Sequence, residues 1–174
     1  MRKLVEELFI PKLVKNVSIR DKAELEGFKK LIKKIEKITE KELQEIISIW
    51  LESNIQTHHY IEKSYWEKNL PVVEKELPKA EIFVDQIDDK IVGFIGIMDG
   101  YIAGVFVEEA YRNQQIGKKL LKKAMELNDR LSLNVYEKNK HAIDFYLKLG
   151  FKKAHMNIDE ETAEKELVMV WEAN

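Results

Sequence analysis

The chain has 174 residues, of which 45% are hydrophobic and 34% are charged, and it contains only 7 glycines and 3 prolines. That composition favours one globular domain and excludes a collagen-like or disordered chain. The net charge of −2 gives no support to nucleic-acid binding, and the absence of cysteine excludes disulfides, thiolate metal sites and a cysteine nucleophile.

The N-terminal segment differs from the rest of the chain in charge. Residues 1–38 hold 11 Lys and Arg against 6 Asp and Glu, whereas residues 39–174 hold 18 against 25. The segment lacks the apolar core of a signal peptide, and no uncharged stretch of the chain approaches the roughly 18 residues of a membrane span, so we expect a cytoplasmic protein. A capping-box pattern at residues 18–21 and apolar residues at helical spacing predict an N-terminal helical extension over residues 1–30. Two roles fit this extension: a helix packed on the domain or on a second copy, and an arm that binds a partner.

The next part of the chain predicts one strand and two helices. Residues 31–38 fit a short strand, although their apolar positions continue the helical spacing of the preceding segment. Residues 39–42 form a capping box, which predicts a helix with an apolar stripe. A polar loop is expected over residues 53–59, followed by a second helix over residues 60–77 that Pro71 kinks or divides.

Three strands are predicted after these helices. Residues 80–87 and 90–98 have the composition of strands, and Asp88-Asp89 joins them as a hairpin. Asp99-Gly100 is a second hairpin signal, and it leads into a third strand over residues 101–107.

Helices and strands alternate in the remainder of the chain. Residues 117–128 and 139–149 predict amphipathic helices, and Gly150 closes the second helix where left-handed backbone is needed. Strands are predicted over residues 131–136, 151–158 and 166–171. The element order indicates one α/β (α+β) domain over residues 31–174, with a mixed, mostly antiparallel sheet flanked by helices.

The strongest indication of chemistry lies between the strand predicted over residues 101–107 and the helix predicted over residues 117–128. Residues 105–121 form a strand, a short polar turn and a helix that begins at Gly117. Such a junction points backbone N–H groups and the positive end of the helix dipole at one spot, which suits a diphosphate. Arg112, Lys118 and Lys119 add positive charge there. The alternative is a basic loop without a ligand.

Two motifs carry a family resemblance. The run Arg112-x-x-Gln115-x-Gly117 resembles the R/Q-x-x-G-x-G/A acetyl-CoA signature of the GNAT N-acyltransferase superfamily. A later run, from Asn139 to Phe151, resembles the family's N-x-x-A-x-x-F-Y-x-x-x-G-F signature. The motifs stand in the family's order and at a suitable separation. The resemblance implies the GNAT fold for this domain.

The resemblance extends beyond these motifs. The element order over residues 31–172 fits the GNAT fold, so the resemblance covers over three-quarters of the chain. Residues 49–66 also resemble a small bacterial branch of the family that includes protein-lysine acetyltransferases.

Gln115 departs from the first signature, because the family has glycine at this position. Glycine permits positive φ and a close approach of the backbone to phosphate. Glutamine can still present its N–H where the local backbone is right-handed. We therefore expect weakened acetyl-CoA binding, and the departure supports an alternative, a non-catalytic acyl-CoA-binding or sensing module.

The resemblance implies direct transfer of acetyl from acetyl-CoA to a primary amine, without a covalent enzyme intermediate. Main-chain groups of Phe106 and Val107 would bind the pantetheine, and Tyr146 would protonate the leaving thiolate. Asn139 would position the cofactor arm, would simply cap the helix that it begins, or would do both. The residues that would hold the diphosphate are Arg112, Asn113, Gln114, Gln115, Ile116, Gly117 and Lys118.

The attacking amine needs a base more than the thiolate needs an acid. A lysine-like amine of pKa about 10.4 is only ~0.04% neutral at pH 7, which corresponds to roughly 4.6 kcal/mol, whereas a thiol of pKa about 8.5 leaves readily. Glu108, just after the cofactor strand, is either this base or an exposed carboxylate. His58 lies in the loop that lines the acceptor cleft in the family, and it is either a second candidate or a packing residue. The four histidines lack metal-ligand spacing, so no metal site is expected.

We therefore predict a GNAT-type acyl-CoA N-acyltransferase whose acceptor is a small molecule, a protein lysine or a protein N-terminus. Tyr101 and Trp66 are candidates for lining an apolar acceptor pocket, with the core as the alternative for Trp66. The expected partners are acetyl-CoA and the amine, with no nucleic acid and no membrane, and with a homodimer as an option. The rivals are the sensing module and an interaction protein that uses residues 1–38.

Overall fold

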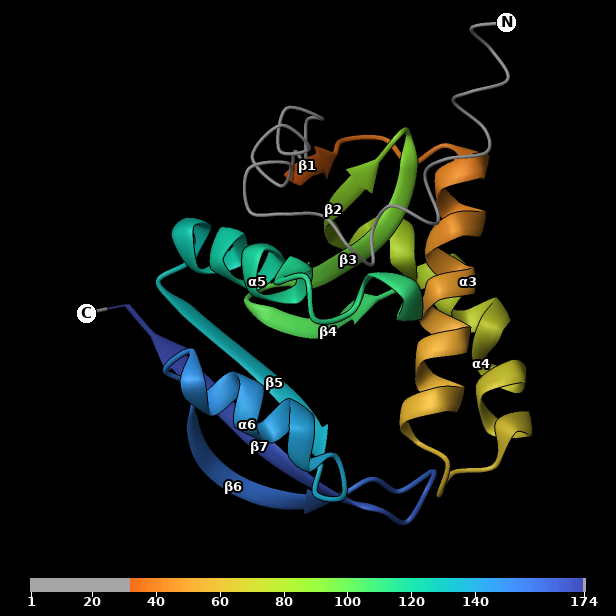
Figure 1. Cartoon of the computed structure of the whole chain (residues 1–174). Coiled ribbons are helices and arrows are strands. Elements are labelled where there is room, and N and C mark those ends of the chain that lie inside the picture. The colour runs from red at the N-terminus through yellow and green to blue at the C-terminus, as the bar shows by residue number, and fades with distance from the viewer. Residues whose placement is uncertain (1–31, 174) are drawn as a thin grey trace, which may run out of the picture. The chain divides into compact units, whose positions relative to one another are not determined.

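The computed structural model describes residues 32–173, so the helical extension predicted over residues 1–30 lies outside the described residues. Within the described range, one seven-stranded sheet has the order β1-β2-β3-β4-β5-β7-β6 and four α-helices pack on it (Figure 1). The strands are β1 (Ile32–Ile35), β2 (Glu81–Ile87), β3 (Lys90–Met98), β4 (Tyr101–Val107), β5 (Arg130–Tyr136), β6 (Lys152–Ile158) and β7 (Lys165–Glu172). The helices are α3 (Glu40–Thr57), α4 (Lys63–Glu76), α5 (Ile116–Leu127) and α6 (Lys140–Lys148).

The sheet is mixed and mostly antiparallel, as the sequence predicts. Only the β4–β5 pair is parallel in the described part of the chain. None of the described helices is long and apolar enough to cross a membrane.

The first helix begins at the predicted capping box, and both helices differ in their bounds from the prediction. The Thr39 hydroxyl accepts from the Glu42 N–H at 3.2 Å and the Glu42 carboxylate accepts from the Thr39 N–H at 2.9 Å, which confirms the capping box. The prediction of a polar loop that begins at residue 53 is wrong, because Ser53 and Asn54 are buried within α3. Pro71 lies inside α4 and does not divide it.

Tight turns join the central strands at the predicted positions. Asp88 and Asp89 have φ of 50° and 61°, and Asp99 and Gly100 have φ of 49° and 77°, so both hairpin turns use left-handed backbone. The ambiguous segment at the start of the described chain forms β1, because Ile32–Ile35 pairs antiparallel with β2.

β4 and β5 separate soon after they meet. Their registered pairing consists of Tyr101 opposite Ser132, and β5 pairs along its whole length with β7 on its other side. Figure 1 shows the two strands diverging from this point. Near the same place the β3–β4 register shifts, so that Ala103 is an extra residue and the strand bends. In the described structure, the β5-facing main chain of residues 103–107 therefore has no strand partner.

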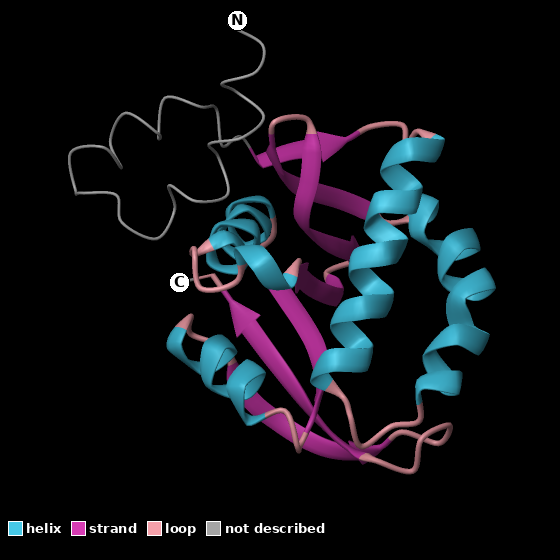
Figure 2. Cartoon of the chain, turned by 45° about the vertical axis from the view of Figure 1, so that its right-hand side comes forward, coloured by secondary structure: helices cyan, strands magenta, loops and turns pink. Residues whose placement is uncertain are grey.

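Two apolar cores lie on opposite faces of the sheet. β3 contributes to both cores, and its alternation is shifted by an extra residue, Val92, in the β2–β3 register: Val92 and Ile95 join the core under α5 and α6, whereas Ile91 and Phe94 join the core under α3. Figure 2 shows α3 and α4 side by side and apart from α5 and α6. The opening between β4 and β5 thus has the β4–α5 loop, α5 and α6 on one side, and α3 and α4 on the other.

Candidate active site

The loop between β4 and α5 is built to present backbone N–H groups. It leaves the sheet where the Glu108 N–H donates to the Val92 carbonyl at 2.9 Å, and it passes through a 3-10 turn at Glu109–Tyr111. α5 begins at Ile116, and no side chain of the described residues caps its first turn. The first N–H groups of a helix need an outside acceptor, so this end of α5 suits an anion.

Gln115 holds the backbone conformation of the glycine that it replaces. We expect its N–H to be available to a ligand on the condition of right-handed backbone, and this condition is not met, because its φ is 63° and its ψ is 11°. Asn113, two residues earlier, has the same φ of 63°. A left-handed residue with a Cβ atom costs roughly 1–2 kcal/mol, and the loop accepts this cost at Gln115.

Replacing Gln115 by glycine is expected to raise the free energy of unfolding by about 1 kcal/mol and to preserve or tighten acetyl-CoA binding. The reason is that glycine adopts positive φ without strain. Urea unfolding and isothermal titration calorimetry measure the two effects. Gln114→Gly is the matched control: Gln114 is not among the positive-φ residues, so glycine should destabilise the protein there. A loss of acetyl-CoA affinity beyond about tenfold in Gln115→Gly would show that the Gln115 side chain binds the ligand itself.

The cationic side chains of the loop divide into two groups. Arg112 holds the loop to the sheet and to α3, since its Nε donates to the Val107 carbonyl at 3.2 Å and its terminal nitrogen donates to Gln56 Oε1 at 2.8 Å. Lys118 instead lines an open groove of about 700 Å³ between α5 and α6, together with Lys122 and Lys148. Lys118 therefore supplies positive charge in the first turn of α5, and Arg112 shapes the loop.

The end of β4 is shaped by Phe106. Its ring stacks on Phe94 with centroids 5.0 Å apart, in the core under α3. The side chain of Val107 packs into the core on the opposite face. Because both side chains are anchored in this way, the main chain between them is held in place beside the opening between β4 and β5.

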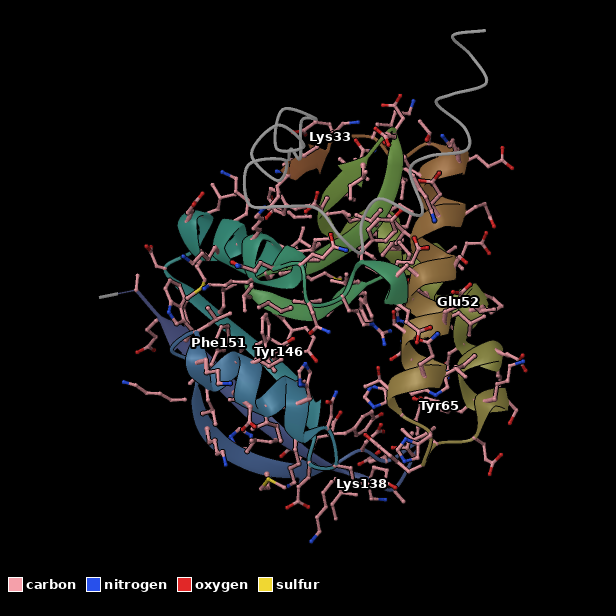
Figure 3. All side chains as sticks on the ribbon, in the orientation of Figure 1. Lys33, Glu52, Tyr65, Lys138, Tyr146 and Phe151 are labelled. Carbon is pink, nitrogen blue, oxygen red and sulfur yellow. The ribbon has the colours of Figure 1, made fainter. Side chains whose placement is uncertain are left out.

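Tyr146 lies on α6 and is 8% exposed. Its ring packs against Phe145 and Phe151, with centroids 5.2 Å and 5.5 Å away. Figure 3 shows it pointing from α6 towards the opening between β4 and β5. Burial, with a smaller contribution from Tyr101, raises the pKa of Tyr146 well above that of an ordinary phenol, so it keeps its proton at neutral pH. Asn139 caps the same helix, where its Oδ1 accepts from the Ala142 N–H at 3.1 Å, which confirms the capping interpretation.

The two predicted base candidates are both engaged by neighbours. Lys90 Nζ lies 2.8 Å from Oε1 and 2.7 Å from Oε2 of Glu108, so this carboxylate is held in a salt bridge at the end of β4. His58 stacks on Trp66 at 5.5 Å, and its Nδ1 lies 2.8 Å from the Tyr60 hydroxyl. Burial, and to a smaller extent His59, lowers the pKa of His58 to about 4. His58 is therefore neutral at pH 7.

His58 belongs to an aromatic cluster at the turn between α3 and α4. Trp66 is buried within it, as the core interpretation predicts, and Tyr136 of β5 meets the His58 ring edge-on at 5.1 Å. The cluster consists of Trp50, His58, Tyr60, Tyr65, Trp66 and Tyr136. It joins α3 and α4 to the far end of β5.

The free energy of unfolding is expected to fall as pH drops from about 6.5 to about 4 because of His58. A histidine in an unfolded chain titrates near pH 6.5, whereas His58 titrates at about 4 in the fold. The unfolded state therefore binds more protons in this window, so the stabilisation is present above pH 6.5 and is lost towards pH 4, by about 1 kcal/mol per pH unit at its steepest. Urea unfolding across this window measures the slope. His58→Gln should flatten it, whereas a change of the exposed His155 to glutamine should not; equal slopes would contradict this account.

Sequence reasoning missed the polar residues on the α3 side of β5 and β7. Asn134 and Tyr136 alternate with buried residues along β5, and Glu166 lies opposite Tyr136 on β7. Asn134 Nδ2 donates to Glu166 Oε2 at 2.9 Å. The signal that the sequence offered was the carboxylate of Glu166 at the start of an otherwise apolar strand, and such a residue does not by itself indicate a site. Among residues 32–173 no group of three His, Asp or Glu side chains could hold a metal ion.

Comparison with known proteins places these features in context. The model of the acetyltransferase (GNAT) family matches residues 42–151. Over 132 residues the chain is 35% identical to the peptidyl-lysine N-acetyltransferase YiaC of Escherichia coli (strain K12), which covers 75% of this chain and 90% of YiaC. It is 34% identical over 110 residues to the peptidyl-lysine N-acetyltransferase YjaB of Salmonella typhimurium, covering 63% of this chain and 76% of YjaB. The solution structure of apo-form YjaB from Escherichia coli matches with a TM-score of 0.70 at 26% identity, over 80% of this chain and 97% of that one.

Proposed function

Because the chain belongs to the acetyltransferase (GNAT) family, we propose that it transfers acetyl from acetyl-CoA to the side-chain amine of a protein lysine. The transfer of acetyl from acetyl-CoA to an amine is the activity of the enzyme, and the proposal concerns the acceptor. Its support in sequence is the similarity to YiaC, a peptidyl-lysine N-acetyltransferase, over 90% of the length of YiaC.

The observation that carries the proposal is that carboxylates lie beside aromatic rings on the sheet face next to the aromatic cluster. Tyr65 donates to Glu161 at 3.1 Å and Tyr136 donates to Asp159 at 2.6 Å, so carboxylates of the β6–β7 turn stand next to aromatic rings. Glu166 lies on the same side. Carboxylates and ring faces both attract an ammonium group, so this side favours a cationic lysine over a neutral or acidic acceptor.

We place acetyl-CoA on the other side of the opening. The N–H groups from Asn113 to Lys118 hold the diphosphate, with the charge of Lys118 beside them. The main chain of Phe106 and Val107, which has no β5 partner in the described structure, pairs with the pantetheine. This arrangement points the thioester towards Tyr146.

Tyr146 acts as the acid in this proposal. The amine nitrogen attacks the thioester carbonyl carbon, the C–S bond breaks, and the sulfur takes the phenolic proton of Tyr146. The supporting observation is that burial raises the pKa of Tyr146, so the proton is present at neutral pH. Since a thiolate is already an acceptable leaving group, this help accelerates the reaction without being indispensable.

The acceptor is tested with two matched peptides and acetyl-CoA. One peptide has an internal lysine and a blocked N-terminus, and the other has arginine in place of lysine and a free N-terminus. Mass spectrometry should find acetyl on the lysine peptide only. Transfer to the free N-terminus alone, or only to a small amine such as a polyamine, would reject the protein-lysine proposal and favour one of the other acceptors.

The organisation of the whole chain remains a proposal as well. We divide it into a helical extension over residues 1–30 and an acetyltransferase domain over residues 31–174. In support, the family model matches residues 42–151, which fall inside that domain. A homodimer is part of the same proposal, and sedimentation velocity of the full chain tests it.

A further inference from the structure

We propose that Glu166 of β7 binds the incoming ammonium group and takes its proton, so that it serves as the general base of the transfer. This inference rests on the proposed function only in that an alkylamine must reach the site. It is motivated by the pairing of Glu108 with Lys90 and by the packing of the half-buried His58 against Trp66 and Tyr60, which engage both of the sequence-derived candidates.

Glu166 stands on the side of the sheet that faces α3 and α4. Its strand neighbour Leu167 is buried on the opposite face, under α6, so the alternation of the strand turns Glu166 the other way. The carboxylate is oriented by the 2.9 Å hydrogen bond from Asn134 Nδ2, which occupies Oε2. Within the described residues, no lysine, arginine or histidine forms a salt bridge with Glu166.

Asn134 connects Glu166 to the opening between β4 and β5. Tyr101 occupies the position where these strands pair, opposite Ser132, and Asn134 follows Ser132 by two residues on β5. The same Asn134 holds the Glu166 carboxylate. Burial, followed by the charge of Glu166, raises the pKa of Tyr101, and Tyr101 contributes after burial to the raised pKa of Tyr146, so these groups lie within electrostatic reach of one another.

The surroundings make Glu166 a better proton acceptor than Asp159. Burial, followed by the charge of Asp159, raises the pKa of Glu166 despite the hydrogen bond from Asn134. The groups facing Glu166 are the phenols of Tyr65 on α4 and Tyr101 on β4, and the Asp159 carboxylate of the β6–β7 turn. A carboxylate whose pKa is raised accepts a proton more readily than an ordinary one, as a general base must.

Asp159, a competing carboxylate, already holds structural hydrogen bonds. It accepts from the hydroxyls of Tyr136 at 2.6 Å and Thr162 at 2.8 Å and from the Glu161 N–H at 2.9 Å. These hydrogen bonds outweigh burial and hold the pKa of Asp159 below its usual value. Asp159 thus organises the β6–β7 turn, and Glu166 remains available to the substrate.

The reaction balances with these groups alone. Glu166 removes one proton from the ammonium, and the freed lone pair forms a C–N bond with the thioester carbonyl carbon. The C–S bond breaks, the sulfur leaves with the electron pair, and it takes the proton of Tyr146. The second nitrogen proton restores Tyr146 through solvent, and Glu166 releases its proton to water, so the products are the amide, CoA thiol and one proton.

The test compares Glu166→Gln with wild type on two small acceptors, n-butylamine and hydroxylamine, in a CoA-release assay. Butylamine is protonated at pH 7 and needs the base, whereas hydroxylamine is mostly neutral and does not. We expect kcat/KM of the variant to fall about 100-fold with butylamine and less than about threefold with hydroxylamine. With butylamine, the difference in kcat/KM between the variant and wild type should decrease as the pH approaches about 10.4, where an alkylamine loses its proton unaided. Glu172→Gln, on the same face of β7, should leave both rates unchanged.

Equal losses with both acceptors would assign Glu166 a structural role, and no loss with butylamine would exclude it as the base; either result overturns the inference. Acetyl-CoA affinity measured by calorimetry should be the same in the variant, because the carboxylate lies on the acceptor side. This result can be told apart from that of the peptide assay. If the wild type acetylates butylamine but no lysine peptide, the protein-lysine acceptor is rejected, and Glu166→Gln can still be compared with wild type on the small amines.

Discussion

Tyr146→Phe is expected to lower kcat at least several-fold, and by up to about 100-fold, while acetyl-CoA affinity stays nearly unchanged. The substitution removes one hydroxyl and keeps the ring that packs between Phe145 and Phe151, so the fold should tolerate it. The loss follows from the proton that burial keeps on Tyr146 at neutral pH and that the leaving thiolate no longer receives.

CoA release at saturating acetyl-CoA measures kcat in this variant, and calorimetry measures affinity. Tyr111→Phe serves as the matched control, because Tyr111 lies in the 3-10 turn beside Lys90 and has no proposed part in the chemistry. An unaltered kcat in Tyr146→Phe would exclude the acid role. A large loss of acetyl-CoA affinity would instead assign the hydroxyl to cofactor binding.

Gly104→Ala is expected to lower the free energy of unfolding by about 1–3 kcal/mol and to raise the KM for acetyl-CoA. A Cβ atom on Gly104 would lie 2.2 Å from a ring carbon of Phe106, far inside van der Waals contact. That ring is held in its stack with Phe94, so it cannot turn away without opening the core under α3. Displacing Phe106 shifts the main chain that we propose pairs with the pantetheine.

Urea unfolding and initial rates at varied acetyl-CoA measure both effects of Gly104→Ala. Its facing residue, Gly96, provides the control, because a Cβ atom there has Ala103 Cβ at 4.0 Å as its nearest neighbour. Gly96→Ala should therefore change stability by less than about 1 kcal/mol. Adding Phe106→Leu to Gly104→Ala should restore part of the stability, and failure to do so would show that the clash is not the cause.

Features that depend on a few consecutive residues could be predicted from the sequence. The capping box at Thr39 and the aspartate turn at residues 88–89 are stabilised by interactions that close within four residues, and the structure confirms them. Gly150 likewise has the expected positive φ of 93° at the end of α6. The two signatures around Gly117 and Asn139 were also local, which is why the fold and the family could be identified before any coordinates.

Local patterns misled where tertiary burial or loop geometry decided the conformation. Residues 53–59 looked like a polar loop, yet Ser53 and Asn54 are buried by the packing of α3, and burial outweighed their weak helix propensity. The residue type of Gln115 favours right-handed backbone, but the path from β4 to α5 places a left-handed residue there. In both cases the deciding interactions come from outside the segment itself.

By itself, the sequence determined the order of the elements, the caps and turns of this protein, and the two motifs that place it among acetyl-CoA-dependent transferases. Only the tertiary structure decided which polar side chains meet. Glu108 pairs with Lys90 across 18 residues of sequence. Hydrogen bonds join Arg112 to Gln56 across 56 residues and Asn134 to Glu166 across 32 residues. The physical reason is that hydrogen bonds and salt bridges depend on distances of a few ångströms, which the packing of the sheet sets and which spacing along the chain does not encode.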